Sequence, residues 1–102
     1  MSLKYILDDQ GNPVPEHDLL RWGDWFKNAS NRLIAWDEIG DAVVSTVFLG
    51  VDHAGDGAQP ILFETMIFGG LHNYHQKQYA TRADALTGHV AAVAMASSST
   101  ET

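Results

Sequence analysis

The chain has 102 residues, of which 45% are hydrophobic and 19% are charged, and it carries a net charge of −7 and no cysteine. This length and composition are typical of one globular domain, and they exclude a chain that is disordered throughout. The lack of cysteine excludes disulfides, thiolate zinc sites and a cysteine nucleophile. Six Lys and Arg residues, spread along the chain, argue against direct binding of nucleic acid, which depends on cationic side chains.

Charge and hydropathy also indicate where the protein acts. No apolar run is close to the ~20 residues that cross a bilayer, and residues 1–10 lack the long apolar centre of a secretion signal. We therefore expect a cytoplasmic protein with no membrane partner. Residues 1–59 carry a charge of −6 and residues 60–102 a charge of −1. An acidic half suits a basic protein partner, although solubility alone is the favoured explanation.

The N-terminal third predicts a strand and a helix. Alternation over residues 3–7 predicts a short strand, which the Gly- and Pro-containing stretch at 8–15 ends. Pro15 suits the first turn of a helix. Leu19, Trp22 and Phe26 recur at helical spacing and predict its buried stripe, and residues 28–31 end it.

The centre of the chain predicts a hairpin and further strands. Residues 32–39 and 42–51 flank Gly40-Asp41, a two-residue connection with glycine first, as a type II′ turn prefers. This turn would set Ile39 opposite Ala42, and Trp36 opposite Ser45. Residues 60–68 predict a third long strand, and a short strand is expected near Gln78 and Tyr79.

The C-terminal helix has a clear start. Thr81 is the expected N-cap, with Asp84 three positions on, and Leu86, Val90 and Val93 form the predicted buried stripe. The predicted order is β-α-β-β-β-(β)-α. This order indicates a small two-layer α+β domain, with an antiparallel sheet of four or five strands and two helices. We expect one domain over residues 1–96 and a flexible tail over residues 97–102.

Three stretches resemble a known group of sequences. They are Val44 to His53, Leu62 to Gly70, and a helix start made by Tyr79, Thr81, Ala85, Gly88 and His89. In this pattern (VSTVFLGxDH, LFETMxFGG, YxTxxxAxxGH) the chain resembles short uncharacterised proteins encoded by bacteriophages, prophages and bacterial genomes. The resemblance covers the C-terminal two-thirds of the chain and implies a phage or prophage protein in the host bacterial cytosol. It implies no particular activity, and His72 and His75 lie in a stretch that departs from the pattern.

Glu64 is the least expected residue of the third strand. Two-residue alternation places it on one side with Leu62, Met66 and Phe68, where a buried carboxylate would need a partner or a proton. It is therefore a candidate acid or base. A sheet face open to water, or a pair with a nearby cation or hydroxyl, is the favoured explanation.

Four residues form a candidate metal set that we consider weak: His53, Glu64, His72 and His75. Imidazole and carboxylate are ligands for zinc and similar ions. The His72-x-x-His75 pair would need a helical turn, which Gly69, Gly70 and Asn73 disfavour. The spacing matches no metal motif, so we expect no metal and no other cofactor.

Tryptophan and acidic residues suggest a contact surface instead. Trp25, Trp36, Asp24, Asp37 and Glu38 are the candidate partner-binding residues, because aromatic side chains dominate binding energy at protein interfaces. Burial of these rings in the core is the favoured explanation.

No catalytic triad can be assembled from the sequence, so we expect no enzyme. The leading hypothesis is a non-enzymatic protein-binding module that modulates or inhibits a host protein, such as a nucleic-acid-binding or defence protein. Its partner would be a host or phage protein, for which a basic surface is one option. Two alternatives stay open. One is a metal-dependent or acid–base enzyme that uses His53 and Glu64, and the other is a homo-oligomeric structural accessory.

Overall fold

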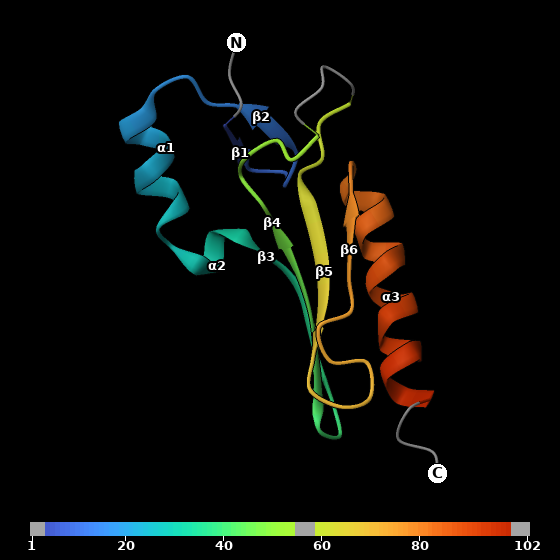
Figure 1. The fold of residues 1–102 in the computed structure, drawn as a ribbon. Coiled ribbons are helices and arrows are strands. Elements are labelled where there is room, and N and C mark those ends of the chain that lie inside the picture. The colour runs from blue at the N-terminus through green and yellow to red at the C-terminus, as the bar shows by residue number, and fades with distance from the viewer. Residues whose placement is uncertain (1–3, 55–58, 99–102) are drawn as a thin grey trace.

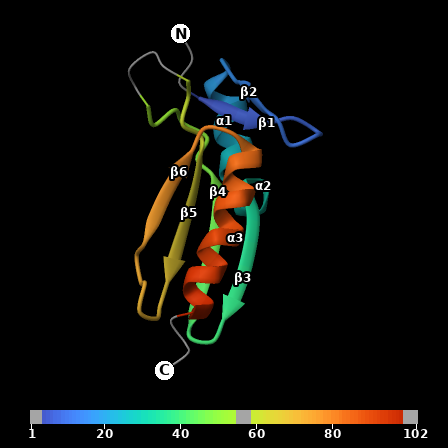
Figure 2. The same cartoon turned by 90° about the vertical axis from the view of Figure 1, so that its right-hand side faces the viewer.

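The computed structural model describes residues 4–54 and 59–98. Its elements in chain order are β1 (Tyr5–Leu7), β2 (Pro13–Pro15), α1 (Leu19–Phe26), α2 (Ala29–Arg32), β3 (Leu33–Ile39), β4 (Ala42–Phe48), β5 (Phe63–Phe68), β6 (Gln76–Tyr79) and α3 (Arg82–Ser98). β3 to β6 form an antiparallel sheet in chain order, and β1 and β2 form a separate hairpin. Helix α3 lies along one face of the large sheet, while α1 and α2 lie toward one end of it, near the hairpin (Figures 1 and 2). The predicted α+β fold is confirmed.

The central hairpin has the predicted register. Ile39 pairs with Ala42, Asp37 with Val44, and Trp36 with Ser45. Gly40 has a φ of 57° while Asp41 has no positive φ, which fits a type II′ turn, whose first central position needs the freedom of glycine. The short fourth strand, β6, pairs with β5 and places Gln78 beside Glu64.

The N-terminal prediction is wrong in two places. Pro15 belongs to β2 and pairs with Tyr5, so the second strand replaces the first turn of the expected helix. The helix begins later, where the Asp18 carboxylate accepts hydrogen bonds from the backbone N–H groups of Leu20 and Arg21. Leu19 was expected in the buried stripe but is exposed.

Helix α1 is instead held by its aromatic residues. Trp22 stacks on Phe26 at 4.5 Å between ring centres, and its Nε1–H donates to the carbonyl of Gly50 at 3.0 Å. The same carbonyl accepts the backbone N–H of Tyr5 at 2.9 Å. Gly50 has a φ of 75°, and a Cβ there would lie 2.8 Å from the Phe26 ring. Residue 50 is therefore confined to glycine by both backbone and space.

Helix α3 begins as predicted but buries a different stripe. The Thr81 hydroxyl accepts the N–H of Asp84. The buried residues of the helix are, however, small ones and a histidine: Ala85, Gly88, His89, Ala92 and Ala96. Leu86 and Val90 are exposed, and Val93 is only partly buried. The reason is steric, because alanine and glycine let the helix lie close to the sheet, where leucine and valine would hold it away.

The helix also extends further than expected. Ser97 and Ser98 belong to α3, so the first two residues of the predicted flexible tail are helical, and residues 99–102 lie outside the described range. Helix α3 joins two neighbouring apolar clusters. One contains Val44, Ile67 and Ala92, and the other contains Phe48 and Phe63. No helix in residues 4–54 and 59–98 is long and apolar enough to cross a membrane.

Gly88 is the point of closest approach between α3 and β6. A Cβ at this position would overlap the hydroxyl and ring carbons of Tyr79. Gly23 in α1 has the opposite environment, because a Cβ there would meet no atom within 4 Å. The two helical glycines thus form a matched pair.

We predict that Gly88→Ala destabilises the protein by about 1–3 kcal/mol, because the Tyr79 ring must move. This loss should exceed the gain of up to about 1 kcal/mol that alanine brings to a helix. Gly23→Ala should show that gain alone. Urea denaturation of the three proteins measures both effects, and a Gly88→Ala protein as stable as the Gly23→Ala protein would contradict the close approach.

Candidate functional site

The face of the large sheet that points away from α3 carries several exposed apolar side chains. Register and alternation place every second residue of the four strands there. We call this surface the open face, and it consists of Leu33, Trp36, Glu38, Val43, Ser45, Val47, Glu64, Met66, Phe68, Gln76 and Gln78. Helix α3 packs on the opposite face, and α1 contacts α2 and β1 and reaches the large sheet through Trp25, which packs against Phe48 on the side of α3.

Apolar side chains dominate the open face. Trp36 is 51% exposed, Leu33 46% and Phe68 43%, and half-buried Val43, Val47 and Met66 lie between them. A sheet with one solvated face usually presents polar residues there. A contiguous apolar surface with an exposed tryptophan is typical of a contact site for another molecule.

The predicted contact residues do not form one surface. Trp36 and Glu38 lie on the open face, where the Trp36 Nε1–H donates to the Glu38 carboxylate at 3.3 Å. Asp37 points to the other side of the sheet, toward α3. Trp25 packs edge-on against Phe48, with 5.7 Å between ring centres, and is partly buried against the core on the side of α3.

Asp24 is also separate from the open face. It forms an exposed ion pair with Lys27, three residues on in the chain, at 2.9 Å. Such a pair is worth little to stability.

Glu64 lies on the open face and is half-buried. Its carboxylate accepts a hydrogen bond from the Gln78 amide at 3.1 Å, across the β5–β6 pair. The environment of Glu64 therefore agrees with the favoured explanation, a carboxylate on a sheet face that is open to water. The strand places no imidazole directly opposite it, since its two pairing partners are Val47 and Gln78.

The histidines of the candidate metal set lie in loops. His53 lies in the loop that follows β4, where its backbone N–H donates to the carbonyl of Ile61. His72 and His75 belong to the turn between β5 and β6. Tyr74, between them, has a φ of 70°, so the turn is not the helical one that a His-x-x-His pair would need. Within residues 4–54 and 59–98, no three His, Asp or Glu side chains are grouped so as to hold a metal ion.

The structure contains a polar chain that was not predicted from the sequence, buried along most of its length and ending at the exposed Asp37 carboxylate. His89 of α3 is 5% exposed. Its Nε2 lies 2.8 Å from the Asp37 carboxylate, and its Nδ1 lies 2.7 Å from the Thr46 hydroxyl. The Thr46 hydroxyl is in turn 2.6 Å from that of Thr65. The chain therefore joins α3 to β3, β4 and β5.

Chemical constraints limit the direction of these hydrogen bonds. A carboxylate only accepts, so the Nε2–H of His89 donates to Asp37. In a neutral imidazole Nδ1 accepts from Thr46, which in turn accepts from Thr65, and in an imidazolium both of these bonds run the other way. The composition resembles a catalytic hydroxyl–imidazole–carboxylate triad, but both hydroxyls are fully or almost fully buried, and a nucleophile must reach its substrate. The chain therefore acts as a structural clamp.

One sequence signal pointed to the clamp. Alternation places Thr46 and Thr65 on the same side as Val44 and Ile67, where a hydroxyl needs a partner. In the structure both ring nitrogens of His89 have hydrogen-bond partners. The partner residues could not be identified from spacing, because 43 residues separate Thr46 from His89.

We predict that Thr46→Val destabilises the protein by about 1–3 kcal/mol, because it leaves both the Thr65 hydroxyl and His89 Nδ1 without a partner. Thr65→Val should cost less, because the bond between Thr46 and His89 survives. In the double variant only Nδ1 is left unpaired, so the two losses should not add. Urea denaturation of these variants measures the coupling, and equal, additive losses would show that the hydroxyls do not form a chain.

Tyr79 lies over α3 beside a small cleft of about 180 Å³ between β6 and the helix. Burial raises the pKa of its hydroxyl above the ordinary value of 10.0, and the nearby Asp84 carboxylate raises it further. Since the unfolded chain ionises first, this contribution to stability is complete below pH 10 and is lost as the pH rises above that value.

We predict that Tyr79→Phe reduces the alkaline loss of stability, because phenylalanine has no proton to lose. The measurement is the difference in unfolding free energy between native and variant proteins from pH 8 to about 11. Tyr74→Phe, at an exposed side chain, is the matched control and should follow the native curve. A Tyr79→Phe curve parallel to the native one would contradict the prediction.

Comparison with known proteins identifies no relative of this chain. No protein-family model matches the chain, and the curated proteins and the solved structures give no significant match. The resemblance to phage and prophage proteins therefore stays a prediction.

Proposed function

We propose that the protein is a non-enzymatic binding module that uses the open face to contact another protein. The observation that carries this proposal is the exposure of Trp36 and Phe68 on a sheet face opposite the covering helix. A tryptophan is the commonest anchor of a protein interface, because it buries a large area with little loss of conformational freedom.

The charges of the open face indicate the chemistry of the partner. Glu38 and Glu64 are its only charged residues, and neither forms an ion pair with another described residue. A partner surface with an apolar centre and a rim of Lys and Arg would bury the aromatic side chains and meet both carboxylates. The net charge of −7 would speed the encounter with such a partner.

The same face bears on the alternative of a homo-oligomer. A second copy would bring the carboxylates of one open face against those of the other, which is unfavourable where charges are close. Pairing through β1 is also restricted, because its Tyr5 N–H already bonds to Gly50 on the side away from β2. These two features favour a different protein as the partner. We further propose that this partner is a host protein and that the present chain is a phage or prophage product that modulates it.

The proposal predicts that Trp36→Ala weakens partner binding at least tenfold without a comparable loss of stability, since hot-spot truncations cost about 2 kcal/mol or more. Leu20→Ala, at a side chain in α1 that is 85% exposed and off the open face, should bind normally. The immobilised native chain and both variants are incubated with bacterial lysate. Any stoichiometric partner is then identified, purified and titrated at two salt concentrations.

Two outcomes would contradict the proposal. One is a partner that both variants retain equally. The other is no partner together with a monomer in light scattering at high concentration. A dimer that Trp36→Ala dissociates would assign the open face to a second copy instead.

A further inference from the structure

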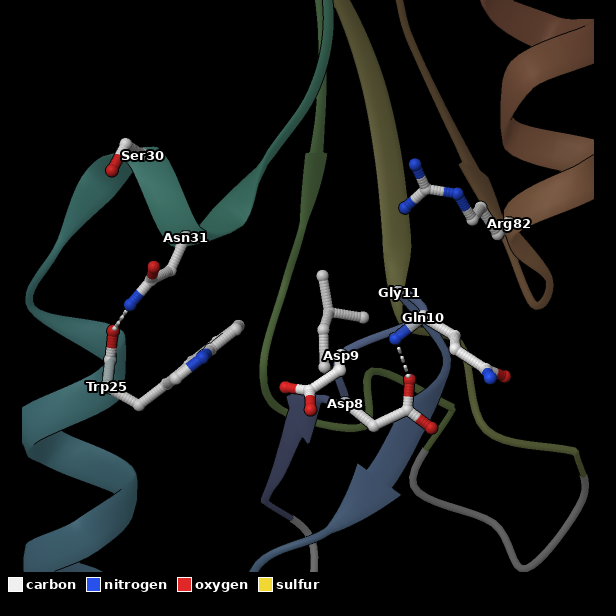
Figure 3. Close-up of a pocket in the computed structure, with 9 residues that line it drawn as sticks. Asp8, Asp9, Gln10, Gly11, Trp25, Ser30, Asn31 and Arg82 are labelled. Carbon is white, nitrogen blue, oxygen red and sulfur yellow. Dashed lines mark hydrogen bonds between the residues drawn. The ribbon is translucent and has the colours of Figure 1, made fainter.

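A polar hollow of about 460 Å³ opens at the end of the fold opposite the Gly40-Asp41 turn. Four parts of the chain surround it: the β1–β2 turn, α1, α2 and the first residue of α3 (Figure 3). Asp8 and Asp9 stand on the turn, Arg82 enters from α3, and Trp25 extends from α1 on the other side. Its volume lies within the range of about 300–1,000 Å³ found for small-molecule sites.

Arg82 places its guanidinium in the hollow without an ion-pair partner among the described residues, although the chain is acidic. Its guanidinium lies against the turn, where a Cβ at Gly11 would be 3.0 Å from Nη1. Gly11 has a φ of 82°, so glycine both forms the turn and leaves room for the guanidinium. Arg82 makes no ion pair or hydrogen bond with any described residue, although two carboxylates line the same hollow.

The acidic side of the hollow is held in place. The Oδ1 atom of Asp8 accepts the backbone N–H groups of Gln10 and Asn12, both at 2.9 Å. These bonds leave Oδ2 free of partners among the described residues. On the far side, the amide of Asn31 donates to the Trp25 carbonyl at 2.9 Å, which ties α2 to α1 (Figure 3). Asp8 and Asn31 are therefore held in position before any ligand arrives, which lowers the cost of binding.

We propose that this hollow binds a small zwitterion of dipeptide size. Its carboxylate would bind Arg82, whose planar fork suits a carboxylate, and its ammonium would bind Asp8 and Asp9. Its apolar body would lie against Trp25 and Leu7. A simple anion would be repelled by the two aspartates and a simple cation by Arg82, so a ligand with both charges fits the site best.

The experiment is an NMR titration of the ¹⁵N-labelled full chain with the dipeptide Leu-Leu, alongside its N-acetyl and C-amide forms. We expect shifts at Asp8 to Gly11, at the Trp25 indole N–H and at Arg82. The acetylated form, which lacks the ammonium, and the amide, which lacks the carboxylate, should each bind at least tenfold more weakly. Arg82→Gln should weaken Leu-Leu binding at least tenfold and leave the amide unaffected.

Asp9→Asn provides the matching test of the ammonium side, and it spares the backbone hydrogen bonds of Asp8. Arg21→Gln removes a positive charge from an exposed position in α1, outside the hollow, and should bind like the native chain. An amide spectrum that resembles that of the native chain will show that each variant is folded. Equal binding of all three peptides would overturn the proposal. So would a lack of chemical-shift changes at about 10 mM Leu-Leu, since this concentration would nearly saturate a site with a Kd of about 1 mM.

Discussion

The close approach of α3 to the sheet is the constraint on which the rest of the structure depends. It requires a helix face of alanine and glycine, with one imidazole, His89, at its centre. Because dispersion forces weaken quickly with distance, this narrow spacing lets small side chains make close contacts between the helix and the sheet. The hydrogen bonds from His89 to Asp37 and Thr46 then set the position of the helix along and across the strands.

This arrangement also explains the open face. A chain of this size can bury only part of its apolar surface, and a single long helix covers a single face of a four-stranded sheet. The strands that supply Ile39, Val44 and Ile67 to the core must, by alternation, present Trp36, Val43 and Phe68 on the other side. A polar sequence could occupy those positions at no cost to the core, so their aromatic character is best explained by contact with another molecule.

The sequence predicted the parts of the fold that local rules control. Gly40-Asp41 specified the hairpin and its register, and Thr81 specified the start of α3, because turn geometry and helix capping act over only a few residues. The buried side of α3 was predicted wrongly, since larger apolar residues were assumed to point inward and the narrow gap to the sheet reversed that preference. Pro15 was misplaced because proline suits both a helix start and a strand edge, and only pairing with Tyr5 decides between them.

The candidate sites show the same division. Glu64 and its solvated face followed from alternation, which a single strand reveals. The clamp through His89 and the hollow around Arg82 each join segments that are distant in sequence, and no spacing rule links such residues. The four candidate metal ligands are not grouped among the described residues, because the histidines belong to two separate loops.

The carbonyl of Gly50 has a consequence for how the molecule comes apart. This one oxygen receives both the Tyr5 amide and the Trp22 indole, so the first hairpin and α1 share an anchor at the end of β4. A shift of that single peptide plane would break both hydrogen bonds at once. The first hairpin and α1 would keep the packing of Tyr5, Leu7 and Trp25 against the cluster around Phe48 and Phe63. The two N-terminal segments are therefore coupled to one another through the end of β4.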